Sequence, residues 1–238
     1  STPVPKSAST CLRMEQFALA ILNGGMATRF GGVPKGTVSI DGDISFLGAK
    51  LLDAKKACEA LGVREPLCFL MCSSATLEPT AAHLRSHNFF GYSENRLILF
   101  SQCESVRFMK NGEIYLTSDG SPSFHGTGHG DLASCIRKRP EFVEFSATGR
   151  ALLLSNVDNV LANVSLPLLN AFLDSDAEML VELVDKNTGD IGGAPLEVDG
   201  RTQLVEAFRV PDGFDHSSVG MFNTNTFWIK PNTLMNRH

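Results

Sequence analysis

The sequence predicts an α/β fold in which a mixed, mostly parallel central sheet is flanked by helices. Several short runs are apolar at every position instead of alternating with polar residues, which is typical of strands buried on both faces. These runs alternate along the chain with segments whose apolar residues have helical spacing. With 238 residues, 43% of them hydrophobic and 20% charged, the chain is long enough to bury a sizeable core.

The individual elements follow from the apolar patterns and their boundaries. Five apolar runs are predicted to be strands: Phe17–Leu22, Leu67–Cys72, Arg96–Phe100, Ala151–Leu154 and Glu178–Val184. Three segments are predicted to be helices: Phe46–Leu61, which Gly62 would end, Thr76–His87, with Pro79 in its first turn, and Leu132–Lys138.

The last part of the chain, from Gly193 to Lys230, has shorter runs broken by Gly, Asp and Pro. We interpret it as a mixed-sheet extension that completes a binding cleft. The chain is therefore divided into an N-terminal tail, residues 1–16, and one domain, residues 17–238. In open sheets of this kind ligands bind beyond the carboxyl ends of the strands, where the motifs described below are found.

Charge and composition exclude several classes of function. The net charge of -5 disfavours a nucleic-acid-binding surface, which needs a basic face. No apolar run approaches the roughly 20 residues that span a bilayer, and Ser1–Thr10 has no apolar signal region. The six cysteines show no zinc-type spacing, and Cys68 and Cys72 are predicted core residues, so we expect a reducing, cytoplasmic setting. The sequence carries no signal for oligomeric state.

The first motif, Asn23–Gly36 (NGGMATRFGGVPKG), directly follows the first predicted strand. Adjacent glycines let backbone N–H groups turn toward an anion, and Thr28, Arg29 and Lys35 add a hydroxyl and two positive charges. The segment matches neither the P-loop pattern nor GxGxxG. A flexible connection is the alternative, but the three polar side chains in this order favour a phosphate-binding loop.

Two further motifs also contain the residue types that phosphate and metal sites use. His125–Asp131 (HGTGHGD) precedes a predicted helix, so its glycines offer N–H groups and His129 a hydrogen-bond donor; a tight turn is the alternative. Asp158, in the run Ser155–Asn159 (SNVDN), follows a predicted buried strand. A carboxylate in that position, facing phosphates, is a natural Mg²⁺ ligand, although a turn or capping role is the alternative.

The order of these motifs resembles that of a known family. The pattern GG-x-x-T-R followed by Pro-Lys resembles the signature loop of sugar nucleotidyltransferases, and Leu22-Asn23-Gly24-Gly25 is similar to the eukaryotic-type UDP-glucose pyrophosphorylases. The resemblance implies a Rossmann-like, GT-A-like nucleotidyltransferase domain. It also implies a magnesium-dependent uridylyltransferase that joins UTP and a sugar 1-phosphate, glucose 1-phosphate by preference, into a UDP-sugar and pyrophosphate.

The resemblance also implies a role for each matching residue. Nucleotide contacts are expected from Asn23, Gly24, Gly25, Thr28, Gln102 and Gly128. The Gln102 amide corresponds to the family's uracil-recognising glutamine, since an amide matches the paired donor and acceptor edge of uracil. Sugar-phosphate contacts are expected from His129, Asn159, Glu206 and Asn225. Catalysis is expected to involve Lys35, Arg29 and Asp158, with Asp158 as the metal ligand.

The chain departs from the family pattern in two places. The sequence ends before the family's second phosphate-binding lysine and C-terminal β-helical domain, so we expect either a fragment or a shortened homologue that completes its site differently. In addition, Ile191 stands where the glucose-specific branch usually has lysine. A non-catalytic nucleotide-binding homologue is therefore an alternative function. A nucleotide-sugar glycosyltransferase is a weaker alternative, because Asp158-Asn159-Val160 lacks the second acidic residue of a DxD motif.

Overall fold

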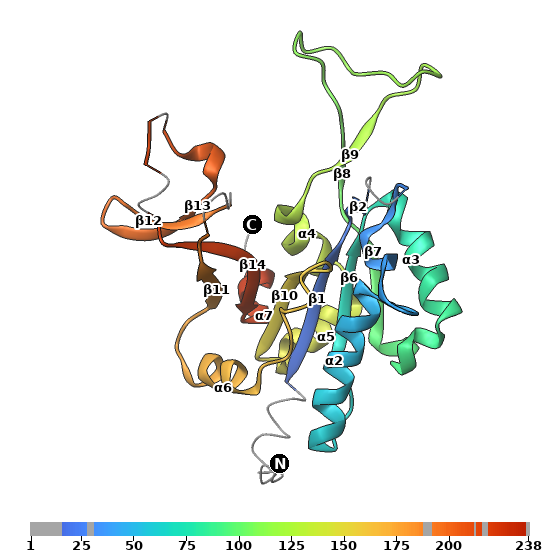
Figure 1. Ribbon diagram of the computed structural model, residues 1–238, viewed down its shortest axis with the longest axis vertical. Helices are drawn as coiled ribbons and strands as arrows, with labels where there is room; N and C mark the ends of the chain where they lie inside the picture. Colours follow the sequence, from blue (N-terminus) through green and yellow to red (C-terminus); the bar gives the residue numbers. More distant parts are fainter. Residues whose placement is uncertain (1–15, 28–30, 188–191, 212, 216–218, 237–238) are drawn as a thin grey trace.

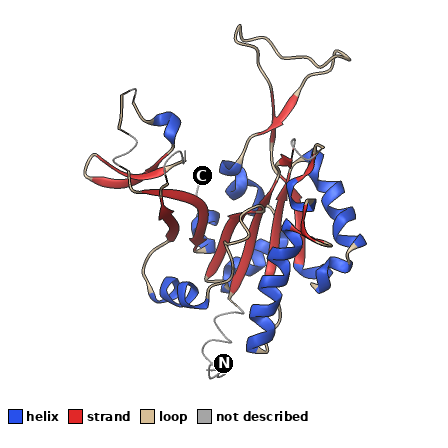
Figure 2. Ribbon diagram, viewed as in Figure 1, coloured by secondary structure: helices blue, strands red, loops and turns tan. Residues whose placement is uncertain are grey.

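A computed structural model gives the structure of the chain, and it describes residues 16–27, 31–187, 192–211, 213–215 and 219–236. A six-stranded sheet forms its centre, in the order β11-β14-β10-β1-β6-β7 (Figures 1 and 2). The strands are β1 (Phe17–Asn23), β6 (Leu67–Cys72), β7 (Leu97–Ser101), β10 (Ala151–Asn156), β11 (Met179–Asp185) and β14 (Met221–Ile229).

The sheet is mixed, as the sequence predicts. Strands β10, β1, β6 and β7 are parallel to one another, and β14 is antiparallel to both of its neighbours, β10 and β11. All seven residues of β1 are buried because helices cover both faces of the sheet, which explains why its first six residues, Phe17–Leu22, are all apolar. The parallel arrangement brings the carboxyl ends of four strands to one edge.

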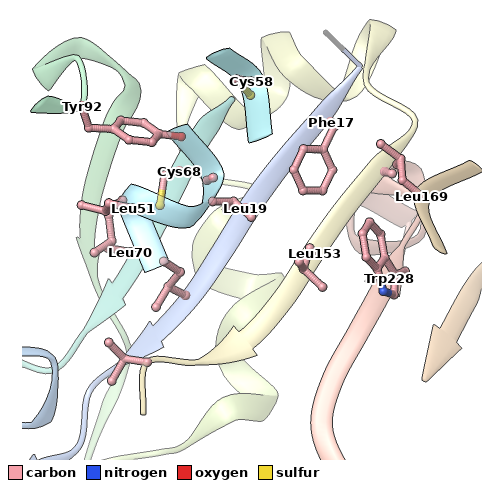
Figure 3. Close-up of a cluster of buried hydrophobic side chains, with 14 of the residues drawn as sticks. Phe17, Leu19, Leu51, Cys58, Cys68, Leu70, Tyr92, Leu153, Leu169 and Trp228 are labelled. Carbon is pink, nitrogen blue, oxygen red and sulfur yellow. The ribbon is translucent and has the colours of Figure 1, made fainter. Parts of the chain in front are cut away.

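Helices pack on both faces of the sheet and enclose two hydrophobic clusters. On one face lie α2 (Phe46–Leu61), α3 (Ser74–Ser86) and α6 (Leu166–Asp174); on the other lie α4 (Leu132–Ile136), α5 (Pro140–Thr148) and α7 (Pro231–Asn236). Figure 3 shows part of the first cluster, in which Phe17 and Trp228 lie with their ring centroids 5.8 Å apart. Trp228 is fully buried, as expected for a core residue.

The helix boundaries follow from local capping. Helix α2 begins after Ser45, whose hydroxyl accepts a hydrogen bond from Gly48 N at 3.1 Å, and ends at Gly62 in the left-handed conformation, as predicted. Helix α3 begins two residues earlier than predicted because Ser73 and Thr76 form a capping box. Pro79 therefore lies inside this helix and not in its first turn.

Several other predicted boundaries are wrong by one or two residues, among them the start of β7 and the ends of β10 and α4. Arg96 closes a 3-10 turn, Glu94–Arg96, so β7 starts at Leu97. Helix α4 stops at Ile136, because the chain turns there toward Pro140, the first residue of α5. The sequence analysis did not identify α5, α6 or α7.

Short elements connect and extend the main layers. Small antiparallel pairs are formed by β2 (Met26–Ala27) with β3 (Val33–Pro34), β4 (Ser39–Asp41) with β5 (Ile44–Ser45), β8 (Glu104–Val106) with β9 (Phe124–Gly126), and β12 (Ala194–Val198) with β13 (Arg201–Val205). The remaining 3-10 turns are η2 (Lys35–Thr37), η3 (Asn88–Gly91), η5 (His129–Asp131) and η6 (Ala207–Arg209). The β8–β9 hairpin projects away from the body of the molecule (Figure 1). The predicted extension, Gly193–Lys230, is wrong in part: β12 and β13 form a separate hairpin, which we call the β12–β13 extension, but β14 belongs to the central sheet because it pairs with β10 and β11.

Candidate nucleotide-binding site

A pocket of about 260 Å³ lies at the carboxyl ends of β1, β6, β7 and β10. Parallel α/β sheets bind ligands at this edge because the loops that leave the strands converge there. The residues that line it are Leu22, Gly24, Gly25, Lys35, Met71, Gln102, Gly128, His129, Asn156, Val157 and Asp158. A larger cavity of about 410 Å³, around Arg150, Glu178 and Lys230, lies at the opposite edge, where the fold gives no reason to expect a ligand.

The glycine-rich loop forms one side of the pocket. Gly24 and Gly25 follow β1, and Lys35 N donates a hydrogen bond to Gly25 O at 3.0 Å, which folds the loop back on itself. The aliphatic part of the Lys35 side chain packs over Gly25, where an added Cβ would lie 3.5 Å from Lys35 Cδ. Thr28 and Arg29, both expected at this site, lie outside the described residues.

An ion pair joins the two sides of the pocket. Lys35 Nζ lies 2.8 Å from Asp158 Oδ2, although 123 residues separate them in the chain. The side chains are 43% and 38% exposed, so water screens the attraction and the pair contributes little to stability. Either group can therefore exchange its partner for a ligand at low energetic cost.

Gln102 and Gly128 lie on the side of the pocket formed by the loops after β7 and β9. The backbone of Gln102 is fixed by a hydrogen bond from its N–H to Cys72 O at 2.7 Å, and its side-chain amide lines the pocket. Gly128 has a φ of 96°, a conformation that glycine adopts without strain.

His129 and Asn225 meet across the pocket wall. A β-bulge in β14 shifts the register at Glu182/Leu183, and Asn225, with a φ of 58°, directs its amide toward the pocket. Asn225 Nδ2 donates to Asn156 Oδ1 at 2.9 Å and lies 3.1 Å from His129 Nδ1. With this amide assignment Nδ1 is the acceptor, so the neutral ring carries its proton on Nε2.

The pKa of His129 is lowered from its ordinary value. Burial is the main cause, because it disfavours the charged ring, and the positive charge of Lys35 acts in the same direction. The carboxylate of Asp158 opposes both effects. His129 is therefore neutral near pH 7 and is suited to donate a hydrogen bond.

Four expected site residues do not line the pocket, and one of them, Asn225, contacts the lining residues His129 and Asn156. Asn23 is fully buried, with its amide donating to Thr80 Oγ1 at 2.9 Å, so it anchors the loop to α3. Its Oδ1 has no hydrogen-bond partner among the described residues. Asn159 Nδ2 donates to Thr226 Oγ1 at 3.2 Å, and Glu206 is exposed beside Gly193 on the β12–β13 extension.

The sequence analysis missed two polar residues near the pocket. Asn156 ends β10 and joins it to Asn225. Lys50 is only 7% exposed, and its Nζ donates to Ser155 Oγ and to Ala162 O, both at 2.9 Å. Its position between Leu47, Leu51 and Ala54 on the apolar face of α2 was a signal in the sequence, because lysine is rarely buried.

Burial lowers the pKa of Lys50 to about 8. The carboxylates of Asp53, Asp158 and Glu182, together with the Cys68 thiol, oppose this effect without cancelling it. Lys50 spans both ends of the segment that carries Asp158, and so fixes the path of that segment.

The residues around Asp158 are compatible with magnesium. Mg²⁺ commonly binds through one or two carboxylates together with phosphate oxygens and water. Asp158 supplies one half-exposed carboxylate at the pocket, and its partner is a cation that a metal can replace. Within the described residues there is no group of three or more His, Cys, Asp or Glu side chains of the kind that forms an all-protein metal site.

The sheet topology and the glycine-lined pocket define the class of this protein as a Rossmann-like α/β domain of the nucleotidyltransferase fold. Comparison with known proteins identifies the family. The family profile described as UTP–glucose-1-phosphate uridylyltransferase matches residues 4–237. The chain belongs to this family.

A curated relative agrees with this assignment, and two solved structures share the fold. The chain is 31% identical over 229 residues to the UTP–glucose-1-phosphate uridylyltransferase of Saccharomyces cerevisiae, an alignment that covers 91% of this chain and 45% of that protein. The structure of a UDP-glucose phosphorylase from Trypanosoma brucei has a TM-score of 0.80 at 24% identity, covering 95% and 50% of the two chains. A uridine diphosphate N-acetylglucosamine pyrophosphorylase from the same organism has a TM-score of 0.78 at 18% identity, covering 94% and 49%.

The chain spans about half the length of the curated relatives it matches. Among the residues that the structure describes, no helix combines the length and apolarity needed to cross a membrane.

Proposed function

We propose that this chain carries the nucleotide-binding site of a uridylyltransferase that converts UTP and glucose 1-phosphate into UDP-glucose and pyrophosphate. The observation that carries the proposal is the Lys35–Asp158 pair, which places a cation and a carboxylate 2.8 Å apart at a pocket lined by glycines. Membership of the family supports the reaction type.

The proposed reaction requires positioning and charge neutralisation more than proton transfer. An oxygen of the sugar 1-phosphate attacks the α-phosphorus of UTP, and pyrophosphate leaves. The second pKa of a phosphate monoester is about 6, so the nucleophile is already ionised at neutral pH and no general base is needed. This agrees with the pocket, in which Lys35 and backbone N–H groups can neutralise and bind phosphate charge and no side-chain nucleophile with a general base is required.

Each side of the pocket has a separate role in the proposed reaction. The backbone N–H groups of Gly24 and Gly25 bind phosphate oxygens, and Lys35 leaves Asp158 to neutralise charge on the reacting phosphates. Arg29 is proposed to assist from the same loop. Gln102 and Gly128 bind the base.

The sugar phosphate is proposed to bind on the side of the pocket formed by His129. The Nε2–H of His129, whose tautomer Asn225 fixes, donates to the phosphate or to a sugar hydroxyl. Asn159, held by Thr226, supports the loop, and Glu206 contacts sugar hydroxyls only if the β12–β13 extension closes toward the pocket. Glucose 1-phosphate is the proposed substrate because the curated relatives that match are named for it.

Asp158 is the residue that would hold magnesium in the proposed reaction. When bound, the metal would supply Lewis-acid stabilisation of phosphate charge. The described cysteines are all free, which fits the proposed reducing, cytoplasmic setting.

Two measurements test the proposal. The first is calorimetric titration of the chain with UTP, CTP, GTP and ATP, and the second is pyrophosphate release from each nucleotide with several sugar 1-phosphates. We expect binding of UTP in preference to the others, and release that depends on magnesium and glucose 1-phosphate. Absence of UTP binding would overturn the proposal.

A second candidate function is nucleotide binding without turnover. It is favoured by one feature of the sequence: Ile191 stands where the glucose-specific branch of the family usually has lysine. UTP binding without pyrophosphate release would support this alternative and exclude the first.

A further inference from the structure

The side chain of Gln102 lies between the backbones of two glycines from different parts of the chain. Gly24 belongs to the loop after β1, and Gly126 is the last residue of β9. A Cβ added to Gly24 would lie 3.2 Å from Gln102 Nε2 and 3.3 Å from Oε1. A Cβ added to Gly126 would lie 1.7 Å from Nε2 and 2.6 Å from Cδ. The amide thus occupies space that any side chain at position 126 would need.

The backbone conformation does not explain the glycine at position 126. Gly126 is not among the residues with positive φ, and it pairs with Glu104 in an ordinary antiparallel hairpin. Alanine would therefore be tolerated by the backbone itself. The requirement for glycine comes from the close approach of the Gln102 amide.

The main chain on either side of the amide is also held firmly. Gln102 N donates to Cys72 O at 2.7 Å, which ties the residue to the end of β6. Cys103 O accepts from both the N–H and the hydroxyl of Thr127, at 3.2 and 3.0 Å, which joins the loops after β7 and β9. The side chain therefore extends from a fixed backbone into a narrow space that fixes the plane of its amide.

We propose that Gly24 and Gly126 form a slot that orients the Gln102 amide, and that Gly126 is a specificity-determining position for the nucleobase. The inference rests on the proposed function, in which Gln102 binds the base. An amide offers one acceptor and one donor side by side, and this pair matches a uracil edge only when the amide lies in the plane of the base. A pair of hydrogen bonds of this kind separates matching from mismatched bases about tenfold or more.

Substitution of Gly126 by alanine is expected to displace the Gln102 amide without changing the fold. The added methyl group meets the far end of a flexible side chain, so Gln102 swings aside instead of straining the backbone. UTP affinity is expected to fall about tenfold or more, with a smaller loss for CTP and GTP, so that the preference for uracil narrows. Gly220→Ala is the matched control, since a Cβ there meets nothing within 4 Å and the residue does not have positive φ.

A double-mutant cycle on the full chain distinguishes the slot from a general disturbance. UTP binding is measured by calorimetry for the wild type, Gly126→Ala, Gln102→Ala and the double variant, with thermal melting as the folding check. Because the atoms that the methyl group meets are absent in Gln102→Ala, the double variant should bind UTP as Gln102→Ala does. If Gly126→Ala has a lower melting temperature than the wild type, the double variant should recover it, because the clash between the methyl group and the Gln102 side chain is removed.

The possible outcomes separate this inference from the proposed function. A wild-type chain that binds no UTP overturns both. If the wild type and Gly126→Ala bind UTP equally well, the slot is overturned and the proposed function stands. The same holds if the loss of UTP affinity in Gly126→Ala adds in full to the loss in Gln102→Ala.

Discussion

Replacement of the buried Lys50 by methionine should remove a pH dependence of folding stability. The pKa of Lys50 is about 8 in the folded protein, against 10.5 for the free side chain. The unfolded chain therefore binds more protons than the folded chain between these two values. Stability contributed by this site is lowest below pH 8, rises as the pH increases through the window, and levels off above the unfolded pKa.

The magnitude follows from the shift. A difference of about 2.5 pKa units corresponds to about 3 kcal/mol of penalty at neutral pH, of which about 2 kcal/mol should disappear between pH 7 and about pH 9.5. Methionine removes this penalty but leaves Ser155 Oγ and Ala162 O without their donor, at a cost of about 1–3 kcal/mol each. At any single pH, the removed penalty and the lost hydrogen bonds are of similar size, so the net change in the free energy of unfolding has no definite sign. The change in that free energy with pH does have a definite sign, because only the lysine titrates.

The assay is urea unfolding of the wild type and Lys50→Met at several values between pH 7 and about pH 9.5. The free energy of unfolding of the wild type should gain about 2 kcal/mol relative to the variant across this range. Lys56→Met, which removes an exposed lysine from the same helix, is the control and should run parallel to the wild type. Parallel curves for Lys50→Met and the wild type would refute the reasoning.

Three further predictions concern the pocket and the core. Lys35→Ala and Asp158→Ala should each lower pyrophosphate release about a hundredfold or more with unchanged melting temperature, because both side chains are half-exposed; release near the wild-type rate would contradict their roles. In Asp158→Asn the pKa of His129, followed by NMR of the ring protons, should fall further below its ordinary value, because the carboxylate that raises it is removed; an upward shift would contradict this electrostatic account. Phe172→Ala should lower the free energy of unfolding in urea by about 3–5 kcal/mol, whereas Leu161→Ala, at an 84% exposed position, should change it little; equal effects would be inconsistent with the core described above.

The parallel strands were predictable because a strand that is buried on both faces has a continuous apolar run in its local sequence. The first six residues of β1 and all residues of β6 are apolar, and short runs of this kind are typical of strands buried on both faces. The insertion of β14 between β10 and β11 was not predictable in the same way, since strand order depends on contacts between distant segments. The early start of α3 depends on a capping contact between Ser73 and Thr76 that the apolar pattern does not reveal.

The same distinction applies to the candidate site. Gly24, Gly25, Lys35, Gly128 and Asp158 belong to contiguous motifs, and the structure brings them to one pocket. The contact of Asn225 with His129 spans 96 residues and needs a bulge whose position no local pattern predicts. Asn23 lies in the motif but points into the protein, because a polar side chain after a buried strand can be used to anchor a loop.

The contacts around Asp158 are of two kinds: buried hydrogen bonds that hold the backbone, and one half-exposed ion pair between Lys35 and Asp158. Lys50 holds Ser155 and Ala162 at the two ends of the segment that carries Asp158, through hydrogen bonds of a buried amine. Between them only the Lys35–Asp158 contact is half-exposed, and such a pair contributes about 1 kcal/mol or less. A triphosphate and a metal ion could therefore separate Lys35 from Asp158 while the backbone beneath them stays in place. The side chains of Lys35 and Asp158 can change partners while the backbone that carries Asp158 stays fixed by Lys50. Binding energy can therefore stabilise the reacting phosphates, because the loop does not need to reorganise.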